Sequence, residues 1–274
     1  MKKFEGILFC TDLDGTLFAD DKSLSKENAN AIEYFKSEGG LFTFITGRVP
    51  LTSFDICEKV KPNAPFGCVN GGGIYDYAEK RFIWSENLPH SSLDLVRHIE
   101  RTLPDLGIII YTENEAYFYN DNFQTQETRR FTGLPYVTCP LEDFSAPILK
   151  SVFAHHEDEH IVRVGEELLS HPRAGEFDFI RSEKRLFEML PKGVSKGTVI
   201  GKLADLLGIK IDRTVAAGDY NNDITMLSAV HHSFAVANAV PEVNAVSRYH
   251  LPVTNNESAI AYIIDGIDTG KYKI

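Results

Sequence analysis

The sequence predicts an α/β protein in which a parallel sheet is flanked by helices and a second α/β module is inserted. Near both ends of the chain, apolar runs of strand length alternate with helical patterns, an order typical of parallel sheets with right-handed crossovers. Between about residues 87 and 187 the pattern changes, and some strand patterns come in adjacent pairs. With 274 residues, of which 43% are hydrophobic, the chain can form one large domain or two modest ones.

Local patterns define the first elements of the core. The apolar run at Ile7–Asp12 indicates a buried strand. Ser25 is a suitable N-cap for a helix that Gly39-Gly40 ends. The next expected elements are a strand at Leu41–Thr46, a helix near Thr52–Lys59, a strand at Phe66–Asn70 and a hairpin at Ile74–Trp84 that turns near Glu79-Lys80.

An α/β module is expected in the middle of the chain. Its predicted helices are Leu93–Leu103, Asn122–Phe131 and His160–Leu169, and its predicted strands are Gly107–Thr112, Ala116–Tyr119, Pro147–His155, Phe177–Ile180 and Arg185–Leu190, with a charged turn at Ser182–Lys184. A module of about 100 residues is of ordinary domain size. We therefore expect a domain at 87–187 inserted into a core formed by 1–86 and 188–274.

The core pattern resumes after the insertion. The expected elements are a helix near Val194–Leu207 that Gly208 ends, a helix from about Asn222, and strands at Thr214–Gly218, Ser233–Val236 and Leu251–Thr254. Strands and helices alternate here as they do at the start of the chain, so both ends are expected to share one sheet. The predicted architecture is a Rossmann-like parallel-sheet core with an inserted α/β domain.

Composition excludes several classes of protein. The net charge of −11 argues against broad nucleic-acid binding, and no stretch approaches the ~20 apolar residues of a membrane span. The amino terminus does not have the pattern of a secretory signal. Four cysteines, Cys10, Cys57, Cys68 and Cys139, show no paired metal spacing. We expect a cytoplasmic protein with reduced thiols, monomeric or weakly dimeric.

Two carboxylates follow the first predicted strand. Asp12 and Asp14 come at its carboxyl end, where ligands bind in open α/β sheets. An EF-hand calcium loop starting at Asp12 would need Gly and Glu at positions that hold Leu17 and Ser23, so the calcium-loop hypothesis fails. Two carboxylates at this spacing could hold a divalent cation and still leave one oxygen free to attack a substrate.

Four segments occur in an order that resembles a known superfamily. They are Asp12–Thr16, Phe44–Arg48, Pro191–Gly197 and Gly218–Met226. From about residue 6 to about residue 264 the chain resembles the haloacid dehalogenase superfamily, and more closely its phosphatase branch. The long insertion, together with Asn70-Gly71-Gly72 and Val253–Glu257, resembles the Cof-like subfamily of sugar-phosphate phosphatases, which carry a large α/β cap.

This resemblance implies a set of catalytic residues. Asp12 would be the nucleophile that forms an aspartyl phosphate, and Asp14 the general acid and base. Mg²⁺ would be held by Asp12, by Asp219 and by the backbone carbonyl of Asp14. Asp223 would orient a metal-bound water or Lys196, although a first-turn acid favoured by the helix dipole is an alternative explanation for it.

The resemblance also implies residues that bind the substrate. The implied phosphate-binding and substrate-binding residues are Thr46, Gly47, Arg48, Asn70, Gly71, Lys196 and Asn222. Thr46 and the N–H of Gly47 would bind a phosphoryl oxygen, and Lys196 would supply a positive charge. Two alternatives remain open for Arg48: contact with the substrate, or a salt bridge that holds its own loop.

The expected function is a Mg²⁺-dependent phosphatase of small phosphorylated metabolites, with sugar phosphates as the first choice. A phosphomutase of the same superfamily is an alternative, and a non-catalytic sugar-phosphate sensor is another. The sensor is disfavoured because Asp12, Asp14, Lys196 and Asp219 are all present. A haloacid dehalogenase is disfavoured because halide release needs no acid at Asp14.

A group of histidines in the insertion does not predict a metal site. His155-His156 and His160 lack the spacing of a zinc site. They fall at the end of a predicted strand, so we expect a solvated polar loop there.

Overall fold

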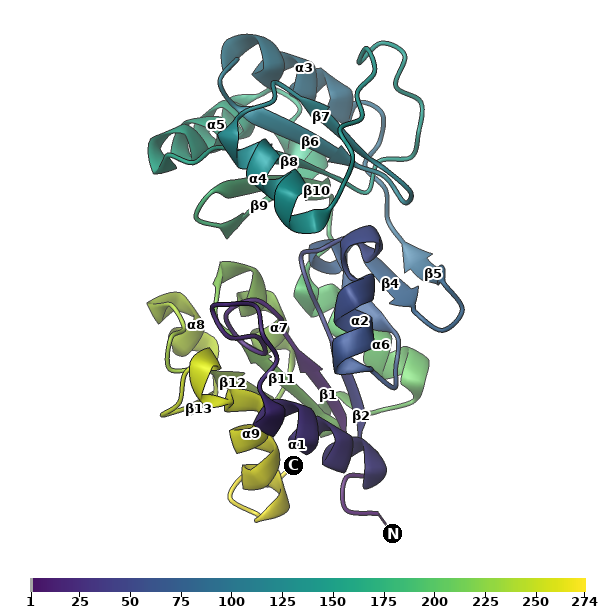
Figure 1. Ribbon diagram of the computed structural model, residues 1–274, viewed down its shortest axis with the longest axis vertical. Helices are drawn as coiled ribbons and strands as arrows, with labels where there is room; N and C mark the ends of the chain where they lie inside the picture. Colours follow the sequence, from purple (N-terminus) through teal and green to yellow (C-terminus); the bar gives the residue numbers. More distant parts are fainter. Residues whose placement is uncertain (1) are drawn as a thin grey trace. The chain divides into compact units, whose positions relative to one another are not determined.

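The structure is a computed structural model that describes residues 2–274. The chain falls into two compact units (Figure 1). The first contains the residues up to Arg48 together with Ser53–Trp84 and Ser195–Ile274, and the second contains Val49–Thr52 and Ser85–Val194.

The first unit is built on a parallel sheet. Its strands are β1 (Leu8–Thr11), β2 (Leu41–Phe44), β11 (Thr214–Gly218), β12 (His232–Ala235) and β13 (Tyr249–His250). They lie in the order β13-β12-β11-β1-β2, and every pair is parallel. The predicted α/β fold class is confirmed. Because β1 lies between β11 and β2, the carboxyl ends of these three strands are neighbours at one edge of the sheet.

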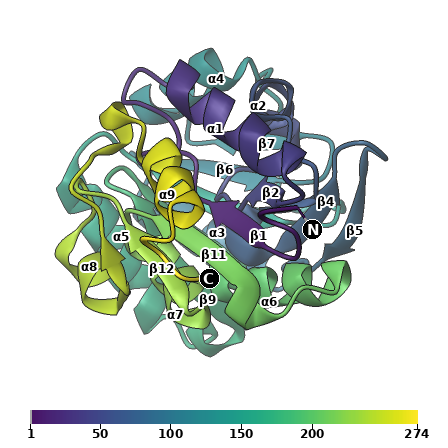
Figure 2. The same ribbon diagram turned by 90° about the horizontal axis from the view of Figure 1, so that it is seen from below.

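Helices cover both faces of this sheet. The helices of the unit are α1 (Lys26–Ser37), α2 (Phe54–Val60), α6 (Lys196–Leu207), α7 (Ile224–Ala229), α8 (Pro241–Val246) and α9 (Ala259–Asp268). Figure 2 shows α1 and α9 on one side of the sheet and α6, α7 and α8 on the other. Phe9 packs on Phe35 of α1, with ring centroids 6.0 Å apart, whereas Leu8 and Cys10 join a cluster with residues of α6 and α7. Strand β1 is therefore buried on both faces, as its apolar run predicts.

The predicted helix ends are confirmed at two positions. The Ser25 hydroxyl accepts a hydrogen bond from the N–H of Asn28 at 3.1 Å and caps α1. At the other end of the unit, α6 begins with a capping box between Ser195 and Thr198 and ends at Gly208, whose φ is +66°. Glycine is favoured there because a side chain destabilises the left-handed conformation.

The strand predicted at Phe66–Asn70 does not belong to the parallel sheet. A three-stranded sheet is formed instead by β3 (Phe66–Cys68), β4 (Gly73–Asp76) and β5 (Arg81–Ser85). β3 and β4 are antiparallel, and β4 and β5 form the predicted hairpin. An isolated bridge between Ile45 and Gly67 connects this sheet to the end of β2. That bridge is parallel, as the predicted alternation implies, but the continuous pairing of β3 is with β4, because a local apolar pattern identifies a strand and not its partner.

The last predicted strand is also wrong. β13 covers Tyr249–His250 and stops before Leu251–Thr254, which has no strand structure. The chain then enters a short 3₁₀ turn at Asn255–Glu257. Backbone hydrogen bonds to the end of β12 continue, from the N–H of Leu251 to the carbonyl of Ala235 and from the N–H of Ala237 to the carbonyl of Val253, both at 2.9 Å. Glu257 accepts hydrogen bonds from the N–H and hydroxyl of Thr254, both at 2.9 Å, and these cap the turn.

The second unit contains an antiparallel sheet and three helices. Its strands, in the order β7-β6-β8-β10-β9, are β6 (Gly107–Tyr111), β7 (Ala116–Tyr119), β8 (Lys150–Ala154), β9 (Phe177–Glu183) and β10 (Leu186–Pro191), and its helices are α3 (Ser92–Thr102), α4 (Phe123–Thr132) and α5 (Asp158–Ser170). All pairings in the sheet are antiparallel. Residues of α3 and α5 form an apolar core with the sheet. The charged turn lies at Lys184-Arg185, because β9 runs on to Glu183.

Within residues 2–274, no helix has both the length and the apolar character needed to cross a membrane. All four cysteines are free thiols, and three of them, Cys10, Cys57 and Cys68, are buried.

Gly201 inside α6 and Gly208 directly after it give a matched test of these backbone assignments. A Cβ at Gly208 or at Gly201 would meet no atom within 4 Å, so packing contributes to neither substitution. Gly208→Ala places alanine at φ +66° and should lower the free energy of unfolding by about 1 kcal/mol. Gly201→Ala lies inside the helix and should raise it by about 0.5–1 kcal/mol. Urea denaturation of both variants measures the difference, and equal effects at the two positions would contradict the assigned helix end.

Candidate active site

The candidate site lies where three adjacent strands end. Asp12 directly follows β1, Asp219 directly follows β11, and Thr46 comes two residues after β2. The N–H of Asp12 still donates to the carbonyl of Ala217 at 2.9 Å, which fixes the first carboxylate against the neighbouring strand. The parallel sheet thus brings together residues separated by about 200 positions in the sequence.

A buried lysine connects two of the carboxylates. Lys196, 1% exposed, donates hydrogen bonds from Nζ to Oδ1 of Asp12 at 2.7 Å and to Oδ1 of Asp223 at 2.6 Å. Burial would lower the pKa of Lys196, but the two carboxylates outweigh it and raise this pKa. The ammonium therefore stays charged and fixes one oxygen of Asp12.

Asp223 organises the loop after β11. Its Oδ2 accepts hydrogen bonds from the N–H groups of Asp219 and Tyr220, at 2.9 and 3.1 Å. A Cβ at Gly218 would lie 2.6 Å from the Cβ of Asp223, so glycine is required there. Both carboxylate oxygens of Asp223 are engaged, one by Lys196 and one by the backbone.

Asp219 is held by the loop that follows β1. The hydroxyl of Thr16 donates to Oδ1 of Asp219 at 2.7 Å. Gly15 has φ +83°, and a Cβ there would lie 2.4 Å from Oδ2 of the same carboxylate. Glycine at this position allows the Asp12–Thr16 loop to approach Asp219 closely.

The acidic cluster fits a hard divalent cation. One carboxylate oxygen from each of Asp12, Asp219 and Asp223 lies within 4.8 Å of the others. Three carboxylates face one ammonium, so negative charge is in excess. Burial, and then the charge of Asp223, raise the pKa of Asp12 to about 7 and the pKa of Asp219 well above its ordinary value. Oδ2 of Asp12 and Oδ2 of Asp219 have no hydrogen-bond partner within residues 2–274, and oxygen is the donor that Mg²⁺ prefers.

The side chain of Asp14 lies outside this cluster. Arg48 binds its two oxygens at 2.8 to 3.0 Å, and Lys22 binds Oδ1 at 2.9 Å. Burial would raise the pKa of Asp14, but Arg48 and Lys22 outweigh it and hold the pKa below its ordinary value. Of the two alternatives for Arg48, the structure has the salt bridge.

The remaining predicted residues gather at the ends of β2 and β3. Asn222 donates from Nδ2 to Oδ1 of Asn70 at 3.0 Å, and a Cβ at Gly47 would lie 2.9 Å from that same oxygen. Oδ1 of Asn222 is buried and has no hydrogen-bond partner within residues 2–274. A Cβ at Gly71 would lie 2.0 Å from the carbonyl oxygen of Ser195, so this glycine lets the loop lie against the start of α6.

The backbone of this loop is strained. Val69 has φ +57° and Asn70 has φ +51°, and a β-branched residue is rare in the left-handed region. The loop is held by hydrogen bonds from the N–H of Val69 to the carbonyl of Arg48 at 2.9 Å and from the N–H of Asn70 to the carbonyl of Thr46 at 3.1 Å. Backbone strain of this kind concentrates at functional sites.

Sequence reasoning missed three residues that hold the first loop. Lys22 binds Asp14, as described above. Asn238 donates to the carbonyl of Gly15 at 2.8 Å and accepts from the N–H of Asn255 at 2.9 Å, and Asn255 donates to the carbonyl of Phe18 at 3.0 Å. Asn255 could have been found from the sequence, because it lies in the Val253–Glu257 segment, which resembles the Cof-like subfamily but was given no role. No signal marked Lys22 or Asn238.

Comparisons with known proteins agree with this geometry. A family model described as haloacid dehalogenase-like hydrolase matches residues 9–264. A 5-amino-6-(5-phospho-D-ribitylamino)uracil phosphatase from Bacillus subtilis (strain 168) is 27% identical over 288 residues, covering 95% of this chain and 98% of the relative. A phosphatase of the same name from Escherichia coli (strain K12) is 27% identical over 267 residues, covering 95% of each chain. A crystal structure of a haloacid dehalogenase-like hydrolase from Bacteroides thetaiotaomicron has a TM-score of 0.84 at 23% identity, covering 95% of this chain and 99% of that chain.

The family match extends over nearly the whole chain. The protein belongs to the haloacid dehalogenase-like hydrolase family, and it is an enzyme of the hydrolase class. The resemblance inferred from the four sequence segments is confirmed.

The geometry predicts which carboxylates contribute side-chain oxygens to a bound cation. Asp219→Asn should weaken Mg²⁺ binding at least about tenfold, because it removes a charged oxygen from the cluster. Asp14→Asn should change the affinity much less, because this side chain binds Arg48 and Lys22 instead. Calorimetric titration of both variants with Mg²⁺ measures the difference. An equal or larger loss in Asp14→Asn would contradict the arrangement.

Proposed function

We propose that the protein is a Mg²⁺-dependent phosphatase that hydrolyses small phosphorylated metabolites through an aspartyl phosphate on Asp12. The observation that carries this proposal is the state of Asp12: Lys196 fixes one oxygen at 2.7 Å, and the other oxygen has no hydrogen-bond partner within residues 2–274. One oxygen is oriented while the second is available to attack. Family membership and the phosphatase names of the relatives support the same reaction class.

In the proposed reaction, Asp12 attacks phosphorus and the bond from phosphorus to the ester oxygen breaks. Asp14 gives a proton to the departing oxygen. In the second half, Asp14 takes a proton from the water that attacks the aspartyl phosphate, and inorganic phosphate leaves. Two steps with a covalent intermediate replace one very slow displacement.

The residues proposed to hold Mg²⁺ are Asp12, Asp219 and the backbone carbonyl of Asp14. When bound, Mg²⁺ supplies positive charge that offsets the repulsion between a carboxylate and a phosphate dianion. Lys196 contributes a second positive charge at the same carboxylate, and Asp223 keeps Lys196 in place. Thr46, the N–H of Gly47 and Asn222 are proposed to bind phosphoryl oxygens.

The proposed acid role requires Asp14 to change partners. A carboxylate bound by Arg48 and Lys22 is held ionised and cannot donate a proton. Substrate must therefore draw the side chain away from this ion pair before the first step. Arg48, once released, becomes available to a phosphoryl oxygen, and Asn70 and Gly71 are proposed to meet the leaving group.

The proposed substrates are phosphate monoesters of sugars or sugar alcohols. The resemblance of the insertion to the Cof-like subfamily favours sugar phosphates as the substrate class. The relatives from Bacillus subtilis and Escherichia coli are named for a phosphorylated ribityl compound, and this favours 5-amino-6-(5-phospho-D-ribitylamino)uracil as a second candidate.

We propose that the insertion at 87–187 acts as a cap that selects among such leaving groups, since the proposed catalytic residues all belong to the other unit. A screen for inorganic phosphate release tests this class, and transfer to a second hydroxyl without phosphate release would indicate a phosphomutase.

Asp12→Asn should abolish turnover. An amide cannot form the aspartyl phosphate, so kcat should fall by about 10⁴-fold or more. Phosphate release at saturating Mg²⁺ measures the loss, and thermal unfolding checks the fold. The control is Asp21→Asn, an exposed carboxylate in the same segment, which should keep the wild-type rate. Retention of substantial activity by folded Asp12→Asn would exclude Asp12 as the nucleophile.

The loss of activity in Asp14→Asn should depend on the leaving group of the substrate. A sugar alkoxide needs a proton when it departs, so its hydrolysis should fall by about 10²–10⁴-fold. p-Nitrophenol departs readily as an anion, so formation of the aspartyl phosphate from p-nitrophenyl phosphate should fall far less. Pre-steady-state release of p-nitrophenol reports this first step directly. Equal losses for both substrates in the first step would argue against Asp14 as the acid.

A further inference from the structure

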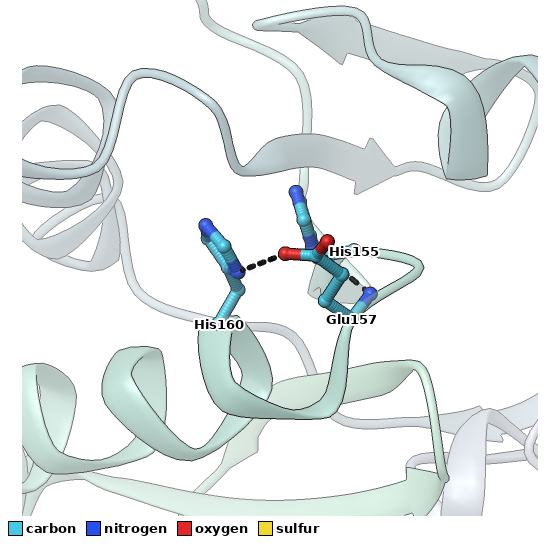
Figure 3. Close-up of side chains that lie close together, drawn as sticks. All are labelled: His155, Glu157 and His160. Carbon is cyan, nitrogen blue, oxygen red and sulfur yellow. Dashed lines mark hydrogen bonds and ion pairs between the residues drawn. The ribbon is translucent and has the colours of Figure 1, made fainter.

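Three side chains of the second unit converge where β8 gives way to α5. His155 follows the last residue of β8, Glu157 precedes α5, and His160 lies in the first turn of that helix (Figure 3). His155 is only 5% exposed, so the solvated loop expected from the sequence is wrong at this residue. None of the three belongs to the candidate active site.

The ligand atoms of this group lie close to one another. One nitrogen from each imidazole and one oxygen of Glu157 are all within 4.8 Å. Nδ1 of His160 is 3.3 Å from Oε2 of Glu157, yet this buried nitrogen has no hydrogen-bond partner within residues 2–274. The two rings stack with centroids 3.8 Å apart and 21° between their planes.

A third histidine and several carboxylates surround this group. His156 stacks on His155, with ring centroids 4.5 Å apart. Burial, and then His160 and His156, lower the pKa of His155. The positive end of the α5 dipole opposes a cation here, but Glu157 and Glu159 offset it, while Asp158 is paired with Arg181.

We propose that His155, Glu157 and His160 form a binding site for a first-row transition-metal dication, with Zn²⁺ as the representative ion. Two imidazole nitrogens and one carboxylate suit Zn²⁺, whereas Mg²⁺ and Ca²⁺ prefer oxygen ligands alone. Water completes the coordination. The bound ion links the end of β8 to the start of α5 and so stabilises the second unit.

Binding requires a local rearrangement. Nδ1 of His155 accepts a hydrogen bond from the N–H of Glu157 at 3.1 Å, and coordination through this nitrogen exchanges that bond for the metal. Lone pairs of stacked rings point in parallel directions, so one ring must turn. His160 is the ring that turns, because its side chain is 31% exposed whereas His155 is buried.

The test is calorimetric titration of the full-length protein with Zn²⁺ in excess Mg²⁺. Wild-type protein should bind one Zn²⁺ per chain at this site and unfold at a higher temperature when loaded. His160→Gln and Glu157→Gln should each weaken this binding at least about tenfold. The matched control is His156→Gln, whose side chain is 45% exposed, and it should bind Zn²⁺ like the wild type.

A second control separates this site from the carboxylate cluster. Asp219→Asn should lose Mg²⁺ affinity but keep the Zn²⁺ equivalent and its thermal shift, so failure of the proposed function and failure of this proposal are distinguishable. His155 is buried, so the decision rests on His160→Gln and Glu157→Gln. Wild-type protein that binds no Zn²⁺ in excess Mg²⁺, or His160→Gln and Glu157→Gln proteins that bind it unchanged, would overturn the proposal.

Discussion

The buried ammonium of Lys196 is the interaction on which the candidate site depends. It lies between Asp12 and Asp223, at 2.7 and 2.6 Å, and so joins the end of β1, the start of α6 and the turn after β11. Removing one partner of a buried ion pair typically costs about 3–5 kcal/mol. The turn after β11 is fixed in the same way, since Asp223 binds its backbone as well as the lysine. One charge thereby positions three segments that are remote in the sequence.

That single positive charge does not neutralise the cluster. Three carboxylates converge, and burial together with the charge of Asp223 raises the pKa values of Asp12 and Asp219. A divalent cation bound there would relieve the excess negative charge. The side chain of Asp14 takes no part, because Arg48 and Lys22 hold it elsewhere. In the proposed mechanism this separation leaves Asp14 free for proton transfer, provided that substrate breaks its ion pairs.

The second unit has its own apolar core and its own polar cluster. Residues of α3 and α5 pack on the antiparallel sheet and form an apolar core with it. The histidines at the start of α5 show an arrangement that sequence spacing alone did not reveal. His155 and His160 are five residues apart, and the turn from strand into helix stacks them at 3.8 Å.

The sequence by itself determined the alternation of strands and helices, the caps at Ser25 and Gly208, and the positions of Asp12 and Asp219 at strand ends. Periodicity and capping act within a few residues, so they can be read locally. Only the tertiary structure decided that Phe66–Cys68 forms its ladder with β4 and a single bridge with the end of β2, that Arg48 binds Asp14, and that His155 is buried. These outcomes depend on which distant segments meet, because the partner of a strand edge or a charged side chain is set by packing rather than by its neighbours in the chain.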